Sequence, residues 1–394
     1  MPTLRGWAAL GAAAALVLLW IAFGERLLLA SAAFLVIAVG FGAFYVRRIA
    51  PRVSVGRELV PDQVHDGDRA LVTVTLVSHR PLAHAHITDT VEGLGAAEFV
   101  ADRVAPSDPL VGRYEVVCRP RGVYRVGPTD IRIRDPFGMA ESGGAAGRID
   151  RLVVYPAIET LEGLPLVRGQ DPNVATSRAR FSQTGGEDFF TMREYQQGDD
   201  LRRVHWPTSA KRDQLMIRQL EMPWQSRALV ILDPDASSYS GPDSFEHAVR
   251  GAASALHHLY TSGFSPTLWT GRIESTSVTS MDTYAMAMEE LAIVQPTVGA
   301  DLRHAIARLR HRGLAGGALF LVTGRVGDSH IALYRSLGRD YTRTTVMAVA
   351  DERNEAILQM RQGGVVTVLA PQGSRWAAAW QEAMERTWST GSQV

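Results

Sequence analysis

The apolar run WAALGAAAALVLLWIAF (residues 7–23) is followed after only three residues by a second run, LLLASAAFLVIAVGFGAFYV (residues 27–46). Neither run contains a charged residue. As helices they reach about 25 and 30 Å, and the hydrocarbon core of a bilayer is about 30 Å thick. Backbone amides in lipid must find partners within their own segment, so both runs should be helical. We therefore expect residues 1–50 to form a transmembrane helical hairpin.

Basic residues predict the orientation of this hairpin. Arg5 precedes the first run, and Arg47, Arg48, Arg52 and Arg57 follow the second, whereas the turn between them carries one Glu and one Arg. The positive-inside rule then places both termini and the soluble domains on the cytoplasmic side of the inner membrane. The alternative is a signal peptide with residues 7–23 as its apolar region. That alternative leaves the second, longer run unexplained.

Composition excludes several classes of protein. The chain has 41 basic and 41 acidic residues. Because basic residues are not in excess, the composition does not indicate nucleic-acid binding. A single cysteine, Cys118, excludes an intrachain disulfide and a zinc site with four cysteine ligands. A phosphate-binding loop ending in Gly-Lys-Ser/Thr is absent from the sequence, so the chain is not itself a P-loop ATPase.

Residues 51–160 change to an alternating pattern that predicts a small antiparallel β-sandwich. Turn residues such as Asp66-Gly67-Asp68 and Gly127-Pro128 separate the expected strands. We predict strands at 69–77, 113–118, 122–126, 129–134 and 151–155, and a flexible hairpin tip at 143–147. Residues 161–226 have weak periodicity and are interpreted as a connecting arm.

From residue 227 onward strands and helices alternate, which predicts a doubly wound α/β sheet domain over residues 227–394. Ala228–Leu232 is a continuous apolar run of the kind found inside a parallel sheet. Further strands are expected at 266–269, 318–322, 345–349 and 365–369, and helices at 243–262, 283–293, 301–312 and 374–388. Trp376, Trp380, Met384 and Trp388 recur at near-helical spacing on the last helix, which indicates either core packing or a docking face.

The densest polar cluster lies in the connecting arm and allows two interpretations. Asp199, Asp200 and His205 could act on a substrate or metal while arginines hold an anion, which would make the protein a hydrolase. Alternatively, the charges pair with each other, because Arg202 and Arg203 each follow an aspartate by one helical turn. The second interpretation makes the cluster structural and favours a protein that is not an enzyme.

This cluster also carries a family resemblance. The matching motif comprises Arg193, Glu194, Tyr195, Gly198, Asp199, Asp200, Arg203, His205 and Trp206, with Asp135-Pro136-Phe137-Gly138 and Val154-Tyr155-Pro156 upstream. The chain thus resembles the domain of unknown function 58 family of membrane-anchored bacterial proteins. The resemblance implies a partner among MoxR-class AAA ATPases and other membrane proteins, and it implies no known enzymatic activity.

The C-terminal part of that family is similar to von Willebrand factor A domains, which hold a divalent cation at the carboxyl edge of the sheet with an Asp-x-Ser-x-Ser motif. Here Asp233, Asp235 and Ser237 occupy the motif, with aspartate in place of the first serine, and Thr323 ends a later strand. The expected second-loop threonine falls near Ala300, with Thr297 out of register, and Gly324 replaces the expected aspartate. The resemblance therefore implies a degenerate site for Mg²⁺ or another divalent cation.

Together these patterns predict a membrane-anchored cytoplasmic interaction or adaptor protein of α/β class. Its expected parts are a transmembrane hairpin, a small antiparallel β-sandwich, a connecting arm and a C-terminal von Willebrand factor A-like sheet domain. A hydrolase that uses Asp199, Asp200 and His205 is the alternative.

Overall fold

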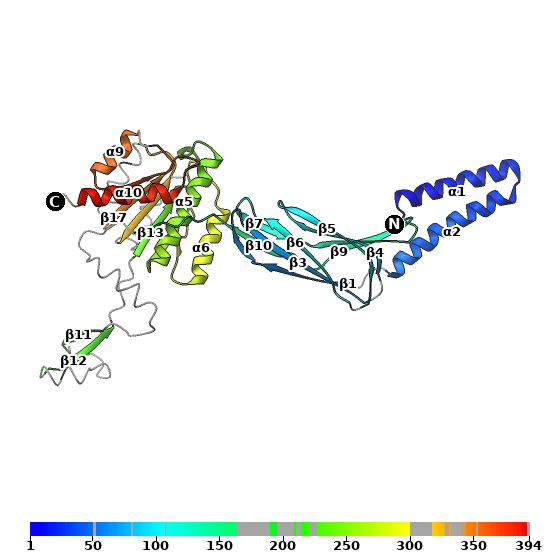
Figure 1. The fold of residues 1–394 in the computed structure, drawn as a ribbon, viewed down its shortest axis with the longest axis horizontal. Coiled ribbons are helices and arrows are strands. Elements are labelled where there is room, and N and C mark those ends of the chain that lie inside the picture. The colour runs from blue at the N-terminus through cyan, green and yellow to red at the C-terminus, as the bar shows by residue number, and fades with distance from the viewer. Residues whose placement is uncertain are drawn as a thin grey trace. The chain divides into compact units, whose positions relative to one another are not determined.

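The computed structural model describes residues 1–49, 53–79, 82–106, 108–163, 190–194, 209, 214–220, 227–299, 317–327, 331, 341, 343–351 and 354–391. The chain divides into two compact units, Met1–Tyr155 and Pro156–Val394. The first contains two long apolar helices and antiparallel sheets, and the second contains a mostly parallel sheet with helices (Figure 1).

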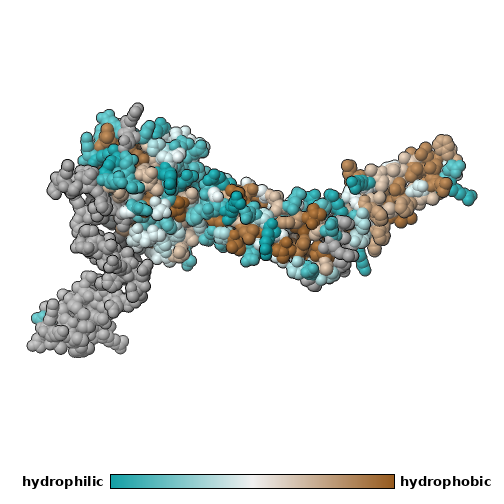
Figure 2. All heavy atoms as spheres, viewed as in Figure 1, coloured by the Kyte–Doolittle hydropathy of each residue, from teal (hydrophilic) through white to brown (hydrophobic). Residues whose placement is uncertain are grey.

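Two apolar helices begin the first unit, as the sequence predicts. Helix α1 (Leu4–Phe23) starts where the Thr3 side chain accepts a hydrogen bond from the Gly6 N–H, and it ends at Gly24, whose left-handed φ of 70° allows the tight turn into helix α2 (Arg26–Ile49). Both helices are long and apolar enough to cross a membrane. Many of their large apolar side chains are exposed, with Leu18 68% and Phe34 69% exposed, and Figure 2 shows the apolar surface over both helices.

Ten strands follow in the first unit: β1 (Val53–Val60), β2 (Gln63–His65), β3 (Arg69–Ser78), β4 (Leu82–Val91), β5 (Gly95–Val104), β6 (Leu110–Val117), β7 (Gly122–Val126), β8 (Thr129–Arg134), β9 (Glu141–Ala146) and β10 (Asp150–Tyr155). One sheet has the order β1-β3-β6, and the other has the order β2-β10-β7-β4-β8-β9 with β5 paired to β4. All pairs are antiparallel except β2 with β10. Alternating apolar side chains from both sheets form the core between them.

The structure corrects one prediction in this region. Residues 143–147 were expected to form a flexible hairpin tip, but Gly143 lies inside strand β9, which pairs with β8. A Cβ atom added to Gly143 would lie 2.3 Å from the carbonyl oxygen of Ile131. Glycine is therefore required here by the close approach of a neighbouring strand rather than by a turn.

A buried ion pair ties strands of both sheets together. The Arg57 guanidinium on β1 bonds both carboxylate oxygens of Asp89 on β4, and its Nη1 donates to Asp150 at 2.9 Å. The side chains of Arg57 and Asp89 are 2% and 0% exposed. Tyr114 and Thr129 also donate hydroxyl bonds to Asp89, at 2.7 Å each. Burial alone would raise the pKa of Asp89, but the bonds from Arg57, Tyr114 and Thr129 outweigh burial and hold that pKa below its ordinary value.

The second unit is built on a sheet of order β15-β14-β13-β16-β17-β18, parallel except for β15. Its strands are β13 (Arg227–Leu232), β14 (Ser265–Trp269), β15 (Thr276–Ser277), β16 (Ala318–Thr323), β17 (Arg343–Ala348) and β18 (Val366–Leu369), and its helices are α5 (Pro242–Thr261), α6 (Met281–Ile293), α9 (Glu355–Gln362) and α10 (Trp376–Gly391). A separate two-stranded sheet pairs β11 (Phe190–Glu194) with β12 (Met216–Leu220). The helix expected at residues 301–312 lies outside the described residues.

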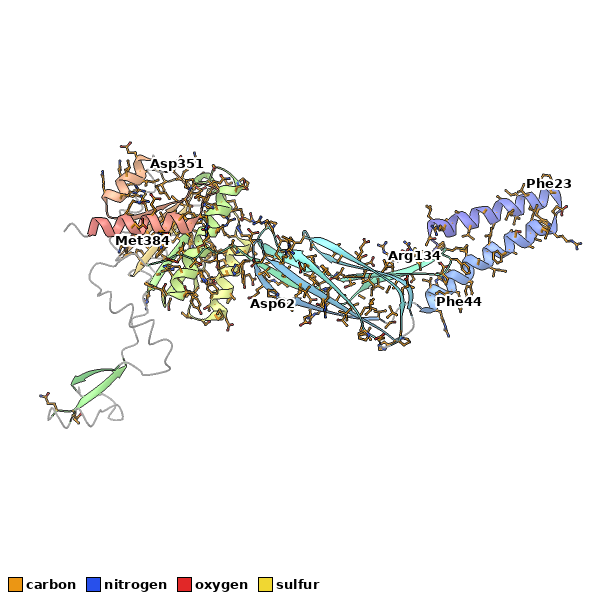
Figure 3. The ribbon with its side chains drawn as sticks, viewed as in Figure 1. Phe23, Phe44, Asp62, Arg134, Asp351 and Met384 are labelled. Atoms are coloured by element: carbon orange, nitrogen blue, oxygen red, sulfur yellow. The ribbon has the colours of Figure 1, made fainter. Side chains whose placement is uncertain are left out.

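Local sequence explains where the main helices begin. Pro242 occupies the first turn of α5, and Ser280 and Thr283 form a reciprocal capping box at the start of α6. Trp376 and Trp380 of α10 are fully buried, and Met384, labelled in Figure 3, is 7% exposed. Core packing is therefore the confirmed role of these three side chains, and the side chain of Trp388 lies outside the described set.

We predict that replacing Asp89 with Asn destabilises the first unit by about 3–5 kcal/mol, because the buried Arg57 charge loses its bidentate partner Asp89 and retains the single bond to Asp150. Hydrogen exchange of the β3 and β4 amides measures this loss. Removing the exposed Arg69–Glu115 pair by Glu115→Gln is the matched control and should cost no more than about 1 kcal/mol. Equal losses in the two variants would contradict the assignment.

The same carboxylate predicts a pH dependence. Because the pKa of Asp89 is lower in the folded than in the unfolded state, its contribution to stability is complete above the unfolded value of about 4. That contribution is lost as pH falls through the folded-state pKa. Acid unfolding of the first unit should therefore lose much of its pH dependence below about pH 4 in Asp89→Asn, when followed by the same amides.

Candidate functional site

The connections of the parallel sheet single out the carboxyl ends of β13 and β16. The chain leaves β13 through α5 to β14 on one side and later returns to β16 on the other side of β13. In open α/β sheets, ligands bind where neighbouring strands have connections that leave in opposite directions. Asp233 follows β13 directly and Thr323 is the last residue of β16. Asp351, labelled in Figure 3, follows β17 at this same edge.

The Asp233 carboxylate joins these two strand ends. Its Oδ2 accepts hydroxyl bonds from Ser238 at 2.7 Å and from Thr323 at 2.8 Å, and its Oδ1 accepts the N–H of Asp235 at 3.0 Å. The residue is 1% exposed. These three bonds fix the orientation of the carboxylate. A buried carboxylate needs such bonds, because it has left water.

Asp235 and Ser237 form a second oxygen pair nearer to solvent. Asp235 caps the short 3-10 helix η2 (Ala236–Ser238), accepting the Ser237 N–H at 3.1 Å and the Ser237 hydroxyl at 2.8 Å. The backbone around Asp235 also pairs with Thr297, whose N–H donates to the Pro234 carbonyl at 2.7 Å. The structure thus brings together the four residues of the predicted cation site, Asp233, Asp235, Ser237 and Thr323.

Sequence reasoning missed Ser238 and Tyr239. The expected motif places its last serine at 237, yet Ser238 is the serine that contacts Asp233, and the Tyr239 hydroxyl donates to the Asp233 carbonyl at 2.5 Å. The consecutive hydroxyls Ser237-Ser238-Tyr239 were the available signal. The tight turn of η2 decides which of them faces inward, and the motif spacing does not reveal that turn.

Gly324 stands where the family resemblance implies an aspartate, and the structure explains the glycine. A Cβ atom at this position would lie 2.0 Å from the carbonyl oxygen of Ser238. That carbonyl also accepts the Arg325 N–H at 2.7 Å. The loop after β13 and the loop after β16 are therefore in direct backbone contact. An aspartate at position 324 would clash with the Ser238 carbonyl, so it cannot serve as a third acidic ligand.

The signature motif is described only in part. Arg193 and Glu194 lie in β11, where they pair in register with Ile217 and Met216 of β12. The other members, Tyr195, Gly198, Asp199, Asp200, Arg203, His205 and Trp206, lie outside the described residues. Both interpretations of this motif, including the hydrolase alternative, stay predictions.

A mostly parallel α/β sheet with an oxygen-lined carboxyl edge, preceded by apolar helices and antiparallel sheets, defines the class of this protein. Residues 191–375 match the family described as "Protein of unknown function DUF58". The uncharacterized protein YeaD of Bacillus subtilis (strain 168) is 32% identical over 219 residues, which cover 53% of this chain and 54% of that protein. The chain thus spans about half the length of the curated relative it matches. The resemblance predicted from the motifs is confirmed.

Solved structures match only parts of the chain. A CARDB domain from Pyrococcus furiosus is 14% identical and covers 27% of this chain and 89% of its own, with a TM-score of 0.21. The sporulation control protein Spo0M from Bacillus subtilis is 13% identical and covers 36% and 58%, with a TM-score of 0.18. These scores are too low to support an inference about this chain.

We predict that Ser238→Ala and Thr323→Val each destabilise the second unit by about 1–3 kcal/mol, because each removes one of the two hydroxyl donors to the buried Asp233 carboxylate. Urea unfolding followed by tryptophan fluorescence, with Trp376 and Trp380 buried in this unit, measures the loss. The matched control is Ser237→Ala at an exposed position, which should change stability by about 0.5 kcal/mol or less. A larger effect at Ser237 than at Ser238 would reverse the assignment.

Proposed function

We propose that this protein is a membrane-anchored adaptor whose α/β unit offers the carboxyl edge of its sheet to a protein partner. The observation that carries the proposal is the pair of carboxylates at the end of β13, with Asp233 oriented from behind by Ser238 and Thr323 and Asp235 nearer to solvent. Carboxylate oxygens held in place at the end of a strand suit the binding of a divalent cation, through which a partner can be recognised. The proposed partner is a MoxR-class AAA ATPase, as the family resemblance implies.

The anchor in this proposal is the hairpin of α1 and α2. Both helices expose large apolar side chains along their length, which favours lipid over water as their surroundings. Arg47 and Arg48 lie in the last turn of α2. The positive-inside rule then puts the folded units in the cytoplasm, at the inner face of the cell membrane.

A divalent cation such as Mg²⁺ is part of the proposal. The site offers only oxygen donors, which hard cations prefer. The hydroxyls of Ser238 and Thr323 donate their protons to Asp233 and retain lone pairs, so Asp235, Ser238 and Thr323 would hold the ion while Asp233 orients them. Among the described residues, no three His, Cys, Asp or Glu side chains gather into a metal-binding group, so hydroxyls have to supply part of the coordination. The fit is to a von Willebrand factor A-like site with fewer acidic ligands.

The expected role is binding rather than catalysis. A cation held by Asp235 would supply an open coordination position to a carboxylate of the partner. Hydrolase chemistry at Asp199, Asp200 and His205 remains an alternative prediction, and no observation on the described residues favours it.

We predict that the full chain in lipid nanodiscs retains the MoxR-class ATPase in a pull-down with Mg²⁺, and that Asp235→Ala weakens retention about tenfold, equivalent to about 1.4 kcal/mol. Asp235 is chosen because it is only half-buried, whereas Asp233 supports the fold. The measurement is a binding isotherm with and without EDTA.

The matched control is Glu385→Ala, which removes an exposed carboxylate from α10 in the same unit. This variant should bind as tightly as the wild type. The adaptor proposal fails if the ATPase is not retained under any condition. The cation part alone fails if EDTA leaves binding unchanged while Asp235→Ala abolishes it.

A further inference from the structure

The start of α1 is hydrogen-bonded to the loop that joins β8 to β9. The Thr3 N–H donates to the Met139 carbonyl at 2.9 Å, and the Thr3 hydroxyl donates to the Gly138 carbonyl at 2.6 Å. The Glu141 N–H donates to the Met1 carbonyl at 2.8 Å, and Pro2 forms a β-bridge with Ala140. The loop therefore holds a fixed position relative to the first turn of α1.

Two glycines let this loop touch both helices. A Cβ atom at Gly6 of α1 would lie 2.1 Å from the Met139 carbonyl oxygen, and one at Gly42 of α2 would lie 3.1 Å from the carboxylate of Asp135. Val46, one turn beyond Gly42, is 1% exposed. The last turns of α2 therefore pack against protein, although they belong to the second apolar run.

The loop itself is rigid and presents one aromatic side chain outward. Asp135 is 2% exposed and accepts the N–H groups of Phe137 at 3.0 Å and Ala140 at 2.5 Å. The Gly138 N–H closes the turn on the Asp135 carbonyl at 2.9 Å, and its φ of 68° suits glycine. Phe137, between these anchored positions, is 59% exposed.

The point at which the loop contacts α1 determines where the loop would lie relative to the boundary between lipid and water. It packs at Gly6, one residue before the apolar run that begins with Trp7. Leu4 and Trp7 are 88% and 63% exposed on the same turn, and the Arg5 guanidinium lies 3.7 Å from the Cβ position of Gly138. Aromatic and arginine side chains at the end of an apolar helix are typical of the boundary between lipid and water.

We infer that the loop Asp135–Ala140 is a membrane-contact element, with Phe137 seated in the phospholipid headgroup layer on the side where α1 begins. The inference rests on the proposed membrane anchoring of the hairpin. A single exposed aromatic elsewhere would be ordinary. Here the loop is hydrogen-bonded to the start of α1 and contacts α2. A bilayer that surrounds the hairpin would therefore extend to the loop, and lipid would cover Phe137.

The test places the fluorophore NBD at single cysteines of the full chain, in a Cys118→Ala background, reconstituted in vesicles of phosphatidylcholine with some phosphatidylglycerol. Phe137→Cys reports on the loop. Val117→Cys is the matched control, because Val117 is 56% exposed and pairs with Arg69 at the start of β3, whereas the end of β3 pairs with the start of β1 next to the hairpin. In Figure 3, Arg134 marks the loop end of the sheets and Asp62 marks the opposite end. Phe34→Cys reports on the hairpin, where the side chain is 69% exposed.

We expect NBD emission at position 137 to rise severalfold and shift to shorter wavelength on reconstitution. It should be quenched best by nitroxide on the lipid headgroup, whereas position 34 should be quenched best by nitroxide deep in the acyl chains. Position 117 should not respond to either. If position 34 is quenched and position 137 behaves like 117, the inference is overturned and the anchor stands. If position 34 is not quenched, the anchoring proposal fails and this inference fails with it.

Discussion

The backbone hydrogen bonds between Met1–Thr3 and the loop Gly138–Glu141 are the constraint on which the first unit depends. They join the hairpin to the sheets at a second point, besides the chain that runs from α2 to β1. Gly6 permits this junction, because a Cβ atom there would clash with the Met139 carbonyl, and Gly42 allows the close approach of Asp135 to α2. A helix pair held in lipid would therefore hold the antiparallel sheets at the membrane surface directly, and not through a free tether.

Two buried aspartates then show two different uses of the same side chain. Asp89 is neutralised by Arg57 in the core between the sheets, so its charge serves the fold. Asp233 accepts two hydroxyl bonds and one amide bond, which orient its carboxylate at the end of β13. Asp233 lies at the carboxyl edge of an open α/β sheet, where ligands bind in such folds, whereas Asp89 lies in the interior of the sandwich.

Periodicity predicted the regular elements well where one face is clearly apolar. Strands β7 and β8 begin and end at the predicted residues, and the helices α5, α6 and α10 lie within a few residues of prediction. Strands β1, β2, β4, β5 and β9 were not predicted, and Gly, Ala, His and Asp interrupt the alternation of β4, β5 and β9. Their pairing with neighbouring strands supplies the stabilisation that the local sequence lacks.

By itself the sequence determined the class of the protein: two apolar spans, a region of short strands, an alternating α/β region and the family that its central motif indicates. It also determined that Asp233, Asp235, Ser237 and Thr323 share one edge, because the carboxyl ends of parallel strands meet there. Only the tertiary structure decided that Ser238 contacts Asp233, that Gly324 leaves no room for a third acid, and that residues 135–140 touch the hairpin. These are contacts between segments far apart in the chain, and a local sequence pattern does not specify how closely two such backbone segments pack.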